Sequence, residues 1–211
     1  MLVAVVLLPL LFYFFADQAF INRLVQEYRP KTGSDYFLWF SFLALAMSVG
    51  LPRQVAAFSS GYLLGAVYGT LFATLAASLA CLLTFVVARF VFHQSLTKRY
   101  PRQLETLSAF FKHDVFTKAF IIRLIPAGSN FLTNVLAGTA KAPLTPYLAG
   151  TMLGFIPQMT LFSMLGAGVS VGDNQQVMLS ATLVIIAGIL VTYLVRKSKN
   201  KSSTVTKSTI D

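Results

Sequence analysis

A long apolar stretch limits what this chain can fold into. Residues 55–92 run for 38 positions, and Arg89 is the only charged residue among them. One continuous helix of this length would be about 57 Å long, whereas the hydrocarbon core of a lipid bilayer is about 30 Å thick. A single straight membrane helix therefore cannot account for the stretch.

The residues just before this stretch indicate where the helix breaks. Pro52 and Arg53 interrupt apolar sequence, and a proline ends or kinks a helix. We expect residues 36–50 to enter a membrane, the chain to break near Pro52, and residues 55–66 to return to the same side. A full span over about residues 69–92 would follow this first hairpin.

The charged residues are too few for a soluble domain. They make up 11% of the 211 residues, against about a quarter in soluble domains, and 56% of the residues are hydrophobic. No acidic residue occurs between Asp35 and Glu105, and none occurs between Asp114 and Asp173. Stretches of this kind need lipid as their solvent, so the sequence predicts an all-α, polytopic membrane protein.

The basic residues indicate which side of the membrane faces the cytoplasm. The net charge is +10, and most Lys and Arg residues lie in two blocks, 98–118 and 196–207. Basic residues beside apolar spans are typical of the cytoplasmic side and attract anionic lipid headgroups. Few aromatic residues interleave with them, so we do not expect nucleic-acid binding.

A second hairpin is predicted over residues 119–140, whose apolar sequence is interrupted by polar residues, Pro126 and glycines. If this segment returns to its own side, the predicted cytoplasmic side carries eleven Lys or Arg residues and the outer side carries three. If it crosses, the basic tail lies opposite the central basic block, which fits the positive-inside tendency less well. We therefore favour four transmembrane helices plus two oppositely oriented re-entrant hairpins, with both termini cytoplasmic, in a bacterial inner (plasma) membrane.

The boundaries follow from this pattern. Residues 1–35 hold the first transmembrane helix and an outer loop, 36–170 the core with both hairpins, 171–195 the last transmembrane helix, and 196–211 a basic, disordered cytoplasmic tail. Because no basic residue precedes the first apolar run, we expect that run to stay as an uncleaved helix. Residues 93–118 are expected to form either an amphipathic helix on the cytoplasmic membrane surface or an ordinary connector.

Two sequence blocks resemble one known family. The first reads LPRQVAAFSSGYLLGAVYGTLFATLAASLACLLTFVVAR, and within it Phe85 and Arg89 match an aromatic-x-x-x-basic motif. The second reads RLIPAGSNFLTNVLAGTAKAPLTPYLAGTMLGFIPQ, in which Gly138, Ala142 and Tyr147 follow a glycine, small-aliphatic, aromatic spacing. Both blocks, in this order, resemble the DedA superfamily, also called the VTT or SNARE-associated domain, and its TVP/TMEM-like bacterial branch in particular.

This resemblance covers about residues 40–170. It implies re-entrant hairpins and a role in moving or scrambling phospholipids or polyprenyl phosphates across bilayers. One departure matters, because proton-coupled members of the family carry acidic residues in the first block, whereas residues 36–104 contain none here. Proton coupling through such acids is therefore not supported. The lipid, the direction, the energy source and the oligomeric state do not follow from the sequence.

Three arginines lie within or at the edge of apolar segments, at positions 53, 89 and 123. Arginine stays charged at any ordinary pH, and placing it in a membrane costs at least about 2.5–3.5 kcal/mol. Because no acidic residue is available at membrane depth, the remaining partners are water, carbonyls freed at helix breaks, or an anionic ligand, and a phosphate suits the guanidinium fork. The predicted anionic-lipid site consists of Arg53, Arg123, Arg89, Asn130 and Asn134. Two alternatives stay open: each arginine could snorkel to the interface, and the two asparagines could hydrogen-bond between helices.

Prolines and glycines mark the predicted breaks and contacts. Helix breaks are expected at Pro52, Pro126 and Pro157. Backbone amides freed at the first two could bind anions, or these prolines could be structural kinks only. Close helix packing is expected at glycines, because a missing side chain lets two helices approach. These glycines are Gly61, Gly65, Gly69, Gly138, Gly150 and Gly154.

Signatures of catalysis are absent from the sequence. It has no His-Glu-x-x-His motif and no Gly-x-Ser-x-Gly motif, and both histidines lie in the basic connector. Cys81 is interpreted as a small residue at a helix contact. We therefore expect no enzyme, no cofactor and no metal, with membrane lipids as partners and a homo-oligomer left open. The predicted function is translocation or scrambling of an anionic lipid, and the alternatives are a membrane-organising assembly factor or a small-solute or ion transporter.

Overall fold

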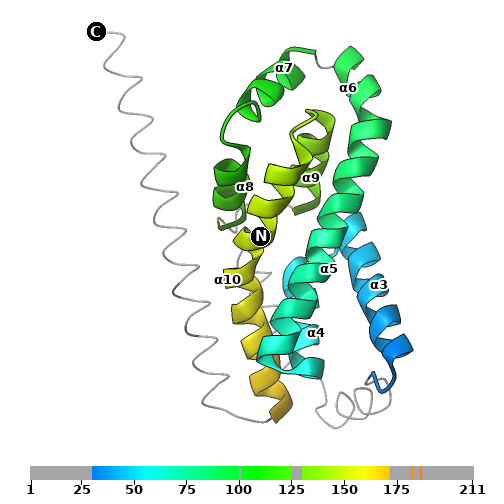
Figure 1. The fold of residues 1–211 in the computed structure, drawn as a ribbon, viewed down its shortest axis with the longest axis vertical. Helices are drawn as coiled ribbons and strands as arrows, with labels where there is room; N and C mark the ends of the chain where they lie inside the picture. Colours follow the sequence, from blue (N-terminus) through cyan, green and yellow to red (C-terminus); the bar gives the residue numbers. More distant parts are fainter. Residues whose placement is uncertain (1–29, 100, 125–129, 172–181, 183–185, 187–211) are drawn as a thin grey trace.

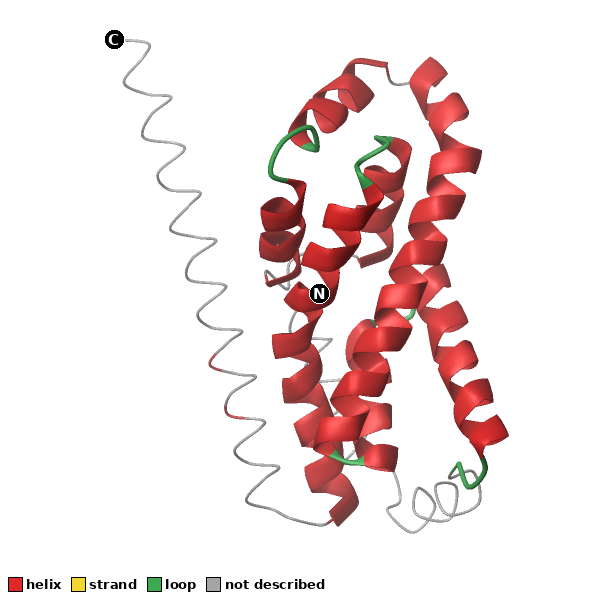
Figure 2. Ribbon diagram, viewed as in Figure 1, coloured by secondary structure: helices red, strands yellow, loops and turns green. Residues whose placement is uncertain are grey.

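The computed structural model describes residues 30–99, 101–124 and 130–171, together with residues 182 and 186. Every regular element in these ranges is a helix, as Figure 2 shows. The all-helical prediction is therefore confirmed for this part of the chain. The predicted first span, the last span apart from residues 171, 182 and 186, the basic tail and Pro126 lie outside the described residues.

The helices follow one another with short connections (Figure 1). The π-helical turn η1 continues α5 without a break and leads into α6. The elements are α3 Gly33–Val49, α4 Arg53–Leu64, α5 Ala66–Val87, η1 Ala88–Phe92, α6 His93–Arg99, α7 Pro101–Phe110, α8 Val115–Leu124, α9 Asn130–Thr139 and α10 Leu144–Val171.

The first hairpin consists of α3 and α4, which are both too short to run the length of the molecule. In Figure 1, α3 rises from the lower end to mid-height and α4 returns toward that end. Gly50 stops α3 with φ 124°, a conformation that side chains rarely allow, and Pro52 then stands in extended backbone as the N-cap of α4. The break expected near Pro52 is therefore present. The start of α3 carries a capping box, because Thr32 and Asp35 each accept from the other's backbone N–H.

The second hairpin consists of α8 and α9 and points the opposite way. In Figure 1, α8 descends below α7 toward mid-height and α9 climbs back in the upper half of the molecule. Asp114 before α8 and Lys141 after α9 both have positive φ, 52° and 53°, which places a sharp turn at the upper end of each helix. Segment 119–140 thus reverses halfway along the molecule, as the hairpin prediction requires. Its orientation in a membrane stays a prediction.

Two of the described helices are long and apolar enough to cross a membrane, Ala66–Phe92 and Leu144–Ser170. Each has 27 residues, which corresponds to about 40 Å of helix and exceeds a hydrocarbon core of about 30 Å. Pro157 lies inside α10, which continues through it to Val171. The helix break predicted at Pro157 is therefore wrong. A proline removes one backbone hydrogen bond, and a long helix packed among neighbours tolerates that loss.

Both hairpins pack against both long helices. The α5 helix contacts α3 and α4 of the first hairpin and α9 of the second, whereas α10 contacts α4 of the first and α8 of the second. Two glycines allow this close packing. A Cβ on Gly61 would lie 2.1 Å from the Ser163 carbonyl oxygen of α10, and one on Gly138 would lie 2.3 Å from the Phe85 carbonyl oxygen of α5. The backbones therefore touch where hairpin and long helix meet.

Four of the other predicted packing glycines can be compared with this pair. A Cβ added to Gly69 would meet Gly61, one added to Gly150 would meet the Phe116 carbonyl, and one added to Gly154 would lie 2.7 Å from Arg123 Cβ. Gly65 is different, and its predicted packing role is wrong: a Cβ there meets nothing within 4 Å, and its φ and ψ are 81° and 172°. The spacing of four residues places glycines on one face only if the helix is continuous, and the chain turns at Gly65 between α4 and α5.

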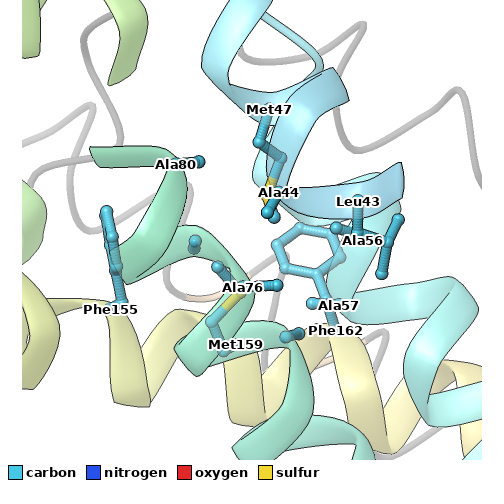
Figure 3. Packing of buried hydrophobic residues seen from close by; sticks show 12 residues of the cluster. Leu43, Ala44, Met47, Ala56, Ala57, Ala76, Ala80, Phe155, Met159 and Phe162 are labelled. Carbon is cyan, nitrogen blue, oxygen red and sulfur yellow. The ribbon is translucent and has the colours of Figure 1, made fainter. Parts of the chain in front are cut away.

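The buried apolar residues form two clusters. Figure 3 shows the first, in which Leu43 and Met47 of α3, alanines of α4 and α5, and residues such as Phe155 and Met159 of α10 come together. The second joins α5, α8, α9 and the start of α10 around Phe85 and Tyr147. Leu104 and Leu107 of α7 pack against this second cluster. These two leucines of α7 are thus turned toward the protein, and the surface helix and the connector both stay predictions.

Candidate functional site

Arg123 stands in the last turn of α8 and is 2% exposed. Its Nη2 donates to Asn134 Oδ1 of α9 and, at 2.8 Å, to the hydroxyl of Tyr147 of α10. The same Asn134 oxygen accepts from the Tyr147 hydroxyl at 2.9 Å and from the Cys81 thiol at 3.2 Å. One amide oxygen therefore accepts from three donors, and Asn134 holds the cation and both neighbours in place.

Arg53 is the first residue of α4, directly after Pro52, and is 5% exposed. Its Nε and Nη2 both donate to Oε1 of Gln158, at 3.0 and 2.5 Å. Gln158 follows Pro157 in α10. Within the part of the chain that the structure describes, the other terminal nitrogen, Nη1, makes no hydrogen bond. Nη1 of Arg53 is thus available to donate to another acceptor.

The ring of Phe155 links the two arginines. The guanidinium carbon of Arg53 lies 5.1 Å from the ring centroid, and that of Arg123 lies 5.2 Å from it. The two cations are therefore no farther apart than the sum of these distances. Phe155 is fully buried, so its contacts with both cations are shielded from bulk solvent.

No carboxylate compensates this pair within the described residues. The acidic side chains there, Asp35, Glu105 and Asp114, are all at least partly exposed. The partners of both arginines are neutral amides, a phenol and an aromatic ring. Two like charges at this separation in a medium of low dielectric repel each other. The arrangement therefore leaves an excess of positive charge at mid-height in the molecule.

Several polar atoms beside these residues are buried and have no partner in the described part of the chain. They include Nε of Arg123 and both amide atoms of Asn130. Asn130 is the first residue of α9 and Arg123 is near the end of α8, so both lie close to the turn of the second hairpin. A buried polar group without a hydrogen bond costs about 1–3 kcal/mol. These atoms are therefore the natural contacts for a polar ligand or water.

Arg89 lies apart from this group. It is half-buried on η1, and its Nη1 donates to the Ala142 carbonyl at 3.3 Å. One turn further, the His93 ring approaches the Thr139 carbonyl at 2.8 Å. Both side chains thus hold the C-terminal end of α9. The structure brings Arg53, Arg123 and Asn134 together and leaves Arg89 at a structural carbonyl contact.

Sequence reasoning did not include three residues that complete the site. Gln158 is the one amide side chain within α10, which is a signal that could have been used. Tyr147 was noted only for its spacing, and Phe155 is one of nineteen phenylalanines without a distinguishing feature. The partners of a buried arginine depend on how α10 crosses both hairpins, which spacing along the chain does not reveal.

The chemistry available here is anion binding. Guanidinium groups donate in a fork that matches phosphate and carboxylate. No group of three His, Cys, Asp or Glu side chains among the described residues could hold a metal ion, and the excess positive charge disfavours a cation in any case. The buried thiol of Cys81 donates to Asn134 and is a member of the network.

Comparison with known proteins found one matching family model and one similar protein. The family model described as "VTT domain" matches residues 51–168, which include α4, α5, the second hairpin and most of α10 but not α3. The chain is 25% identical over 179 residues to the "Uncharacterized protein YqeD" of Bacillus subtilis (strain 168), covering 82% of this chain and 83% of that protein. No solved structure matches the chain.

Proposed function

Since the chain is a membrane protein of the VTT-domain (DedA) family, we propose that it moves an anionic lipid across a bacterial inner (plasma) membrane. The substrate class is a phospholipid or a polyprenyl phosphate, and its phosphate binds between Arg53 and Arg123. The single observation that carries the proposal is the pair of buried arginines on one aromatic ring without a described carboxylate.

The energetics favour an anion at this position. Each arginine costs at least about 2.5–3.5 kcal/mol to place in the membrane, and the pair adds mutual repulsion. A phosphate between them would offset both terms and accept hydrogen bonds from the unused donors, Arg53 Nη1 and Arg123 Nε. Asn130, whose amide is buried without a described partner, would provide a further contact.

The membrane arrangement is part of the proposal. We infer four transmembrane helices and two re-entrant hairpins, with α3–α4 entering from one side and α8–α9 from the other. Support comes from the two long apolar helices and from the half-length hairpins, which point in opposite directions in Figure 1. Both termini would be cytoplasmic because of the basic residues. Reporter fusions at Asp114 and Lys141 should then report the same side.

The test is lipid movement in vesicles that contain the purified protein. The vesicles are made of phosphatidylethanolamine and phosphatidylglycerol with a trace of nitrobenzoxadiazole-labelled phosphatidylglycerol, and movement is followed by back-extraction into serum albumin. Arg53→Ala and Arg123→Ala should abolish movement. Arg123→Lys should retain only part of it, since lysine keeps the charge but loses the fork.

A matched control is available in Arg102, which is an exposed arginine on α7. Arg102→Ala should move lipid like the parent protein, with equal amounts of folded protein checked by size exclusion. The anion-site proposal is wrong if the two buried-arginine variants fold and move lipid at the parent rate. A parent protein that moves no lipid while taking up a small solute would favour the transporter alternative.

A further inference from the structure

Each buried arginine is held by the side-chain oxygen of an amide. Gln158 Oε1 of α10 accepts from Nε and Nη2 of Arg53, at 3.0 and 2.5 Å. Asn134 Oδ1 of α9 accepts from Nη2 of Arg123. The two amides lie on different helices and hold arginines of different hairpins. The same kind of contact therefore occurs twice beside the Phe155 ring.

A carboxylate would satisfy the same donors. It binds a guanidinium group with two parallel hydrogen bonds, which are stronger than those to a neutral oxygen. Arg53 offers two such donors, and both go to the single oxygen of Gln158. Glutamate matches glutamine in size, and aspartate matches asparagine, so steric fit does not explain the amides. What the amides lack is negative charge.

The missing negative charge leaves both arginines uncompensated. The acidic side chains in the described ranges, Asp35, Glu105 and Asp114, are all at least partly exposed. An anion at the pair therefore meets two positive charges, and the attraction between charges is stronger inside a protein than in water. Nε of Arg123 is also buried without a partner in the described structure, so a donor is in place for that anion.

We propose that Gln158 and Asn134 are specificity-determining residues, which orient the two arginines but, being neutral, leave both positive charges for the phosphate of the lipid. This inference rests on the proposed function. Hydrogen bonding to the amides fixes where Arg53 and Arg123 stand, and the neutrality of the amides sets the charge that the ligand must bring. A carboxylate at either place would act as an internal anion and compete with the phosphate.

The first measurement is thermal unfolding of the purified full chain in dodecyl maltoside micelles, with and without a small fraction of dodecyl phosphate. The parent protein should melt several degrees higher when dodecyl phosphate is present. Gln158→Glu should melt at or above the parent without dodecyl phosphate, because its carboxylate holds Arg53 through the same donors. The dodecyl phosphate concentration that gives half of the shift should be at least about tenfold higher for this variant, since one charge is cancelled.

A purely structural role of Gln158 predicts a different result. Glutamate accepts the same hydrogen bonds, so a residue that only holds Arg53 could be replaced by glutamate without changing the response to dodecyl phosphate. That response in Gln158→Glu, or no stabilisation of the parent, overturns the inference. The matched control is Gln94→Glu, the same change at an exposed glutamine of α6, which should behave like the parent in both conditions.

Asn134→Asp makes the same test at Arg123. It keeps an oxygen for the donors that Asn134 serves and cancels the other positive charge, so its response to dodecyl phosphate should also be weakened. This variant decides the question if Gln158→Glu does not fold. Failure of both variants to fold also overturns the inference, because it requires that a carboxylate can hold each arginine in place.

Lipid movement in the vesicles described above separates this inference from the proposed function. The parent should move labelled phosphatidylglycerol, and Gln158→Glu should move it severalfold more slowly at an equal amount of folded protein. If the parent moves no lipid, the proposed function fails, and the thermal shift in micelles decides the inference by itself. If the parent and Gln158→Glu move lipid at the same rate, the function stands and the inference fails.

Discussion

Each of the two hairpins buries an arginine, and the two arginines are held by different hydrogen-bond partners. Each has an arginine near its turn and a closely packed glycine in its second helix, Gly61 in α4 and Gly138 in α9. In the second hairpin, Arg123 is held by Asn134 of its own second arm and by Tyr147. In the first, Arg53 donates to Gln158 of α10 and has no polar partner among the described residues of its own hairpin.

This difference in hydrogen bonding shows that a buried arginine can be held firmly or can keep a donor available for a ligand. Asn134 Oδ1 accepts from three donors, so removing it affects the whole second set. Gln158 serves Arg53 alone, and the Nη1 of that arginine has no hydrogen bond in the described structure. The second hairpin is thus the more rigid half of the site, and the first hairpin carries the arginine that is more easily detached.

The largest expected effect comes from the glycines that seat the hairpins. Gly61→Leu and Gly138→Leu should each prevent accumulation of folded protein. Even the Cβ of the new side chain would lie 2.1 or 2.3 Å from a backbone oxygen, and moving that backbone aside would cost much of the folding free energy. Folded protein is measured by fluorescence-detected size exclusion after membrane extraction. If only one of the two variants fails, the hairpins are not seated equivalently.

Gly33 and Gly65 provide the controls for this comparison. Gly33 has open space and ordinary backbone angles, so Gly33→Leu should accumulate like the parent. Gly65 has open space but a φ of 81°. Gly65→Ala and Gly65→Leu should therefore cost about the same, on the order of 1–3 kcal/mol, since the cost is backbone strain. A much greater loss with Leu would show that Gly65 is in a contact.

An intermediate effect should separate the two arginine sets. Asn134→Leu leaves the Arg123 guanidinium and two other buried donors without their acceptor, which should cost on the order of 3 kcal/mol or more. Gln158→Leu should cost less, because the free arm of Arg53 can bond to water. Thermal unfolding in detergent measures both variants. Equal losses would contradict the view that the second hairpin is the more rigid half.

The smallest expected effect concerns Asp35 at the start of α3. Asp35 accepts from the backbone N–H groups of Thr32 and Lys31, at 2.9 and 3.0 Å, and these bonds hold the pKa of its carboxyl below the usual 3.8. The folded-state pKa is depressed, so the stabilisation is present above the unfolded-state pKa and is lost as the pH falls through the folded-state value.

The corresponding variant is Asp35→Asn. It should melt slightly below the parent at pH 7, and the difference should shrink toward zero as the pH falls well below 3.8. A matched variant, Glu105→Gln on the exposed face of α7, should show no such pH-dependent difference. A gap for Asp35→Asn that persists unchanged at low pH would mean that the carboxylate charge is not what caps α3.

Much of the helix pattern could be predicted from particular residues. Pro52 after a long apolar run predicted the division between α3 and α4, and the polar interruptions after Arg123 predicted that α8 and α9 form a hairpin. Two local predictions were wrong. Pro157 lies within a continuous helix and Gly65 lies in a turn. Proline and glycine indicate only which backbone conformations are favoured locally, whereas packing against neighbouring helices determines which conformation the folded chain adopts.

The sequence by itself determined that this chain is helical, needs lipid around it, and carries arginines in apolar segments without nearby acids. These properties depend on composition and on the local order of residues. The length of an apolar segment and the charge of an arginine are the same whatever residues surround them in the fold. Only the tertiary structure decided that α10 crosses both hairpins and so gives Arg53 its Gln158, Arg123 its Tyr147, and both of them Phe155. Residues 53 and 158 are far apart along the chain, and their contact exists only because glycines let each hairpin lie directly against a long helix.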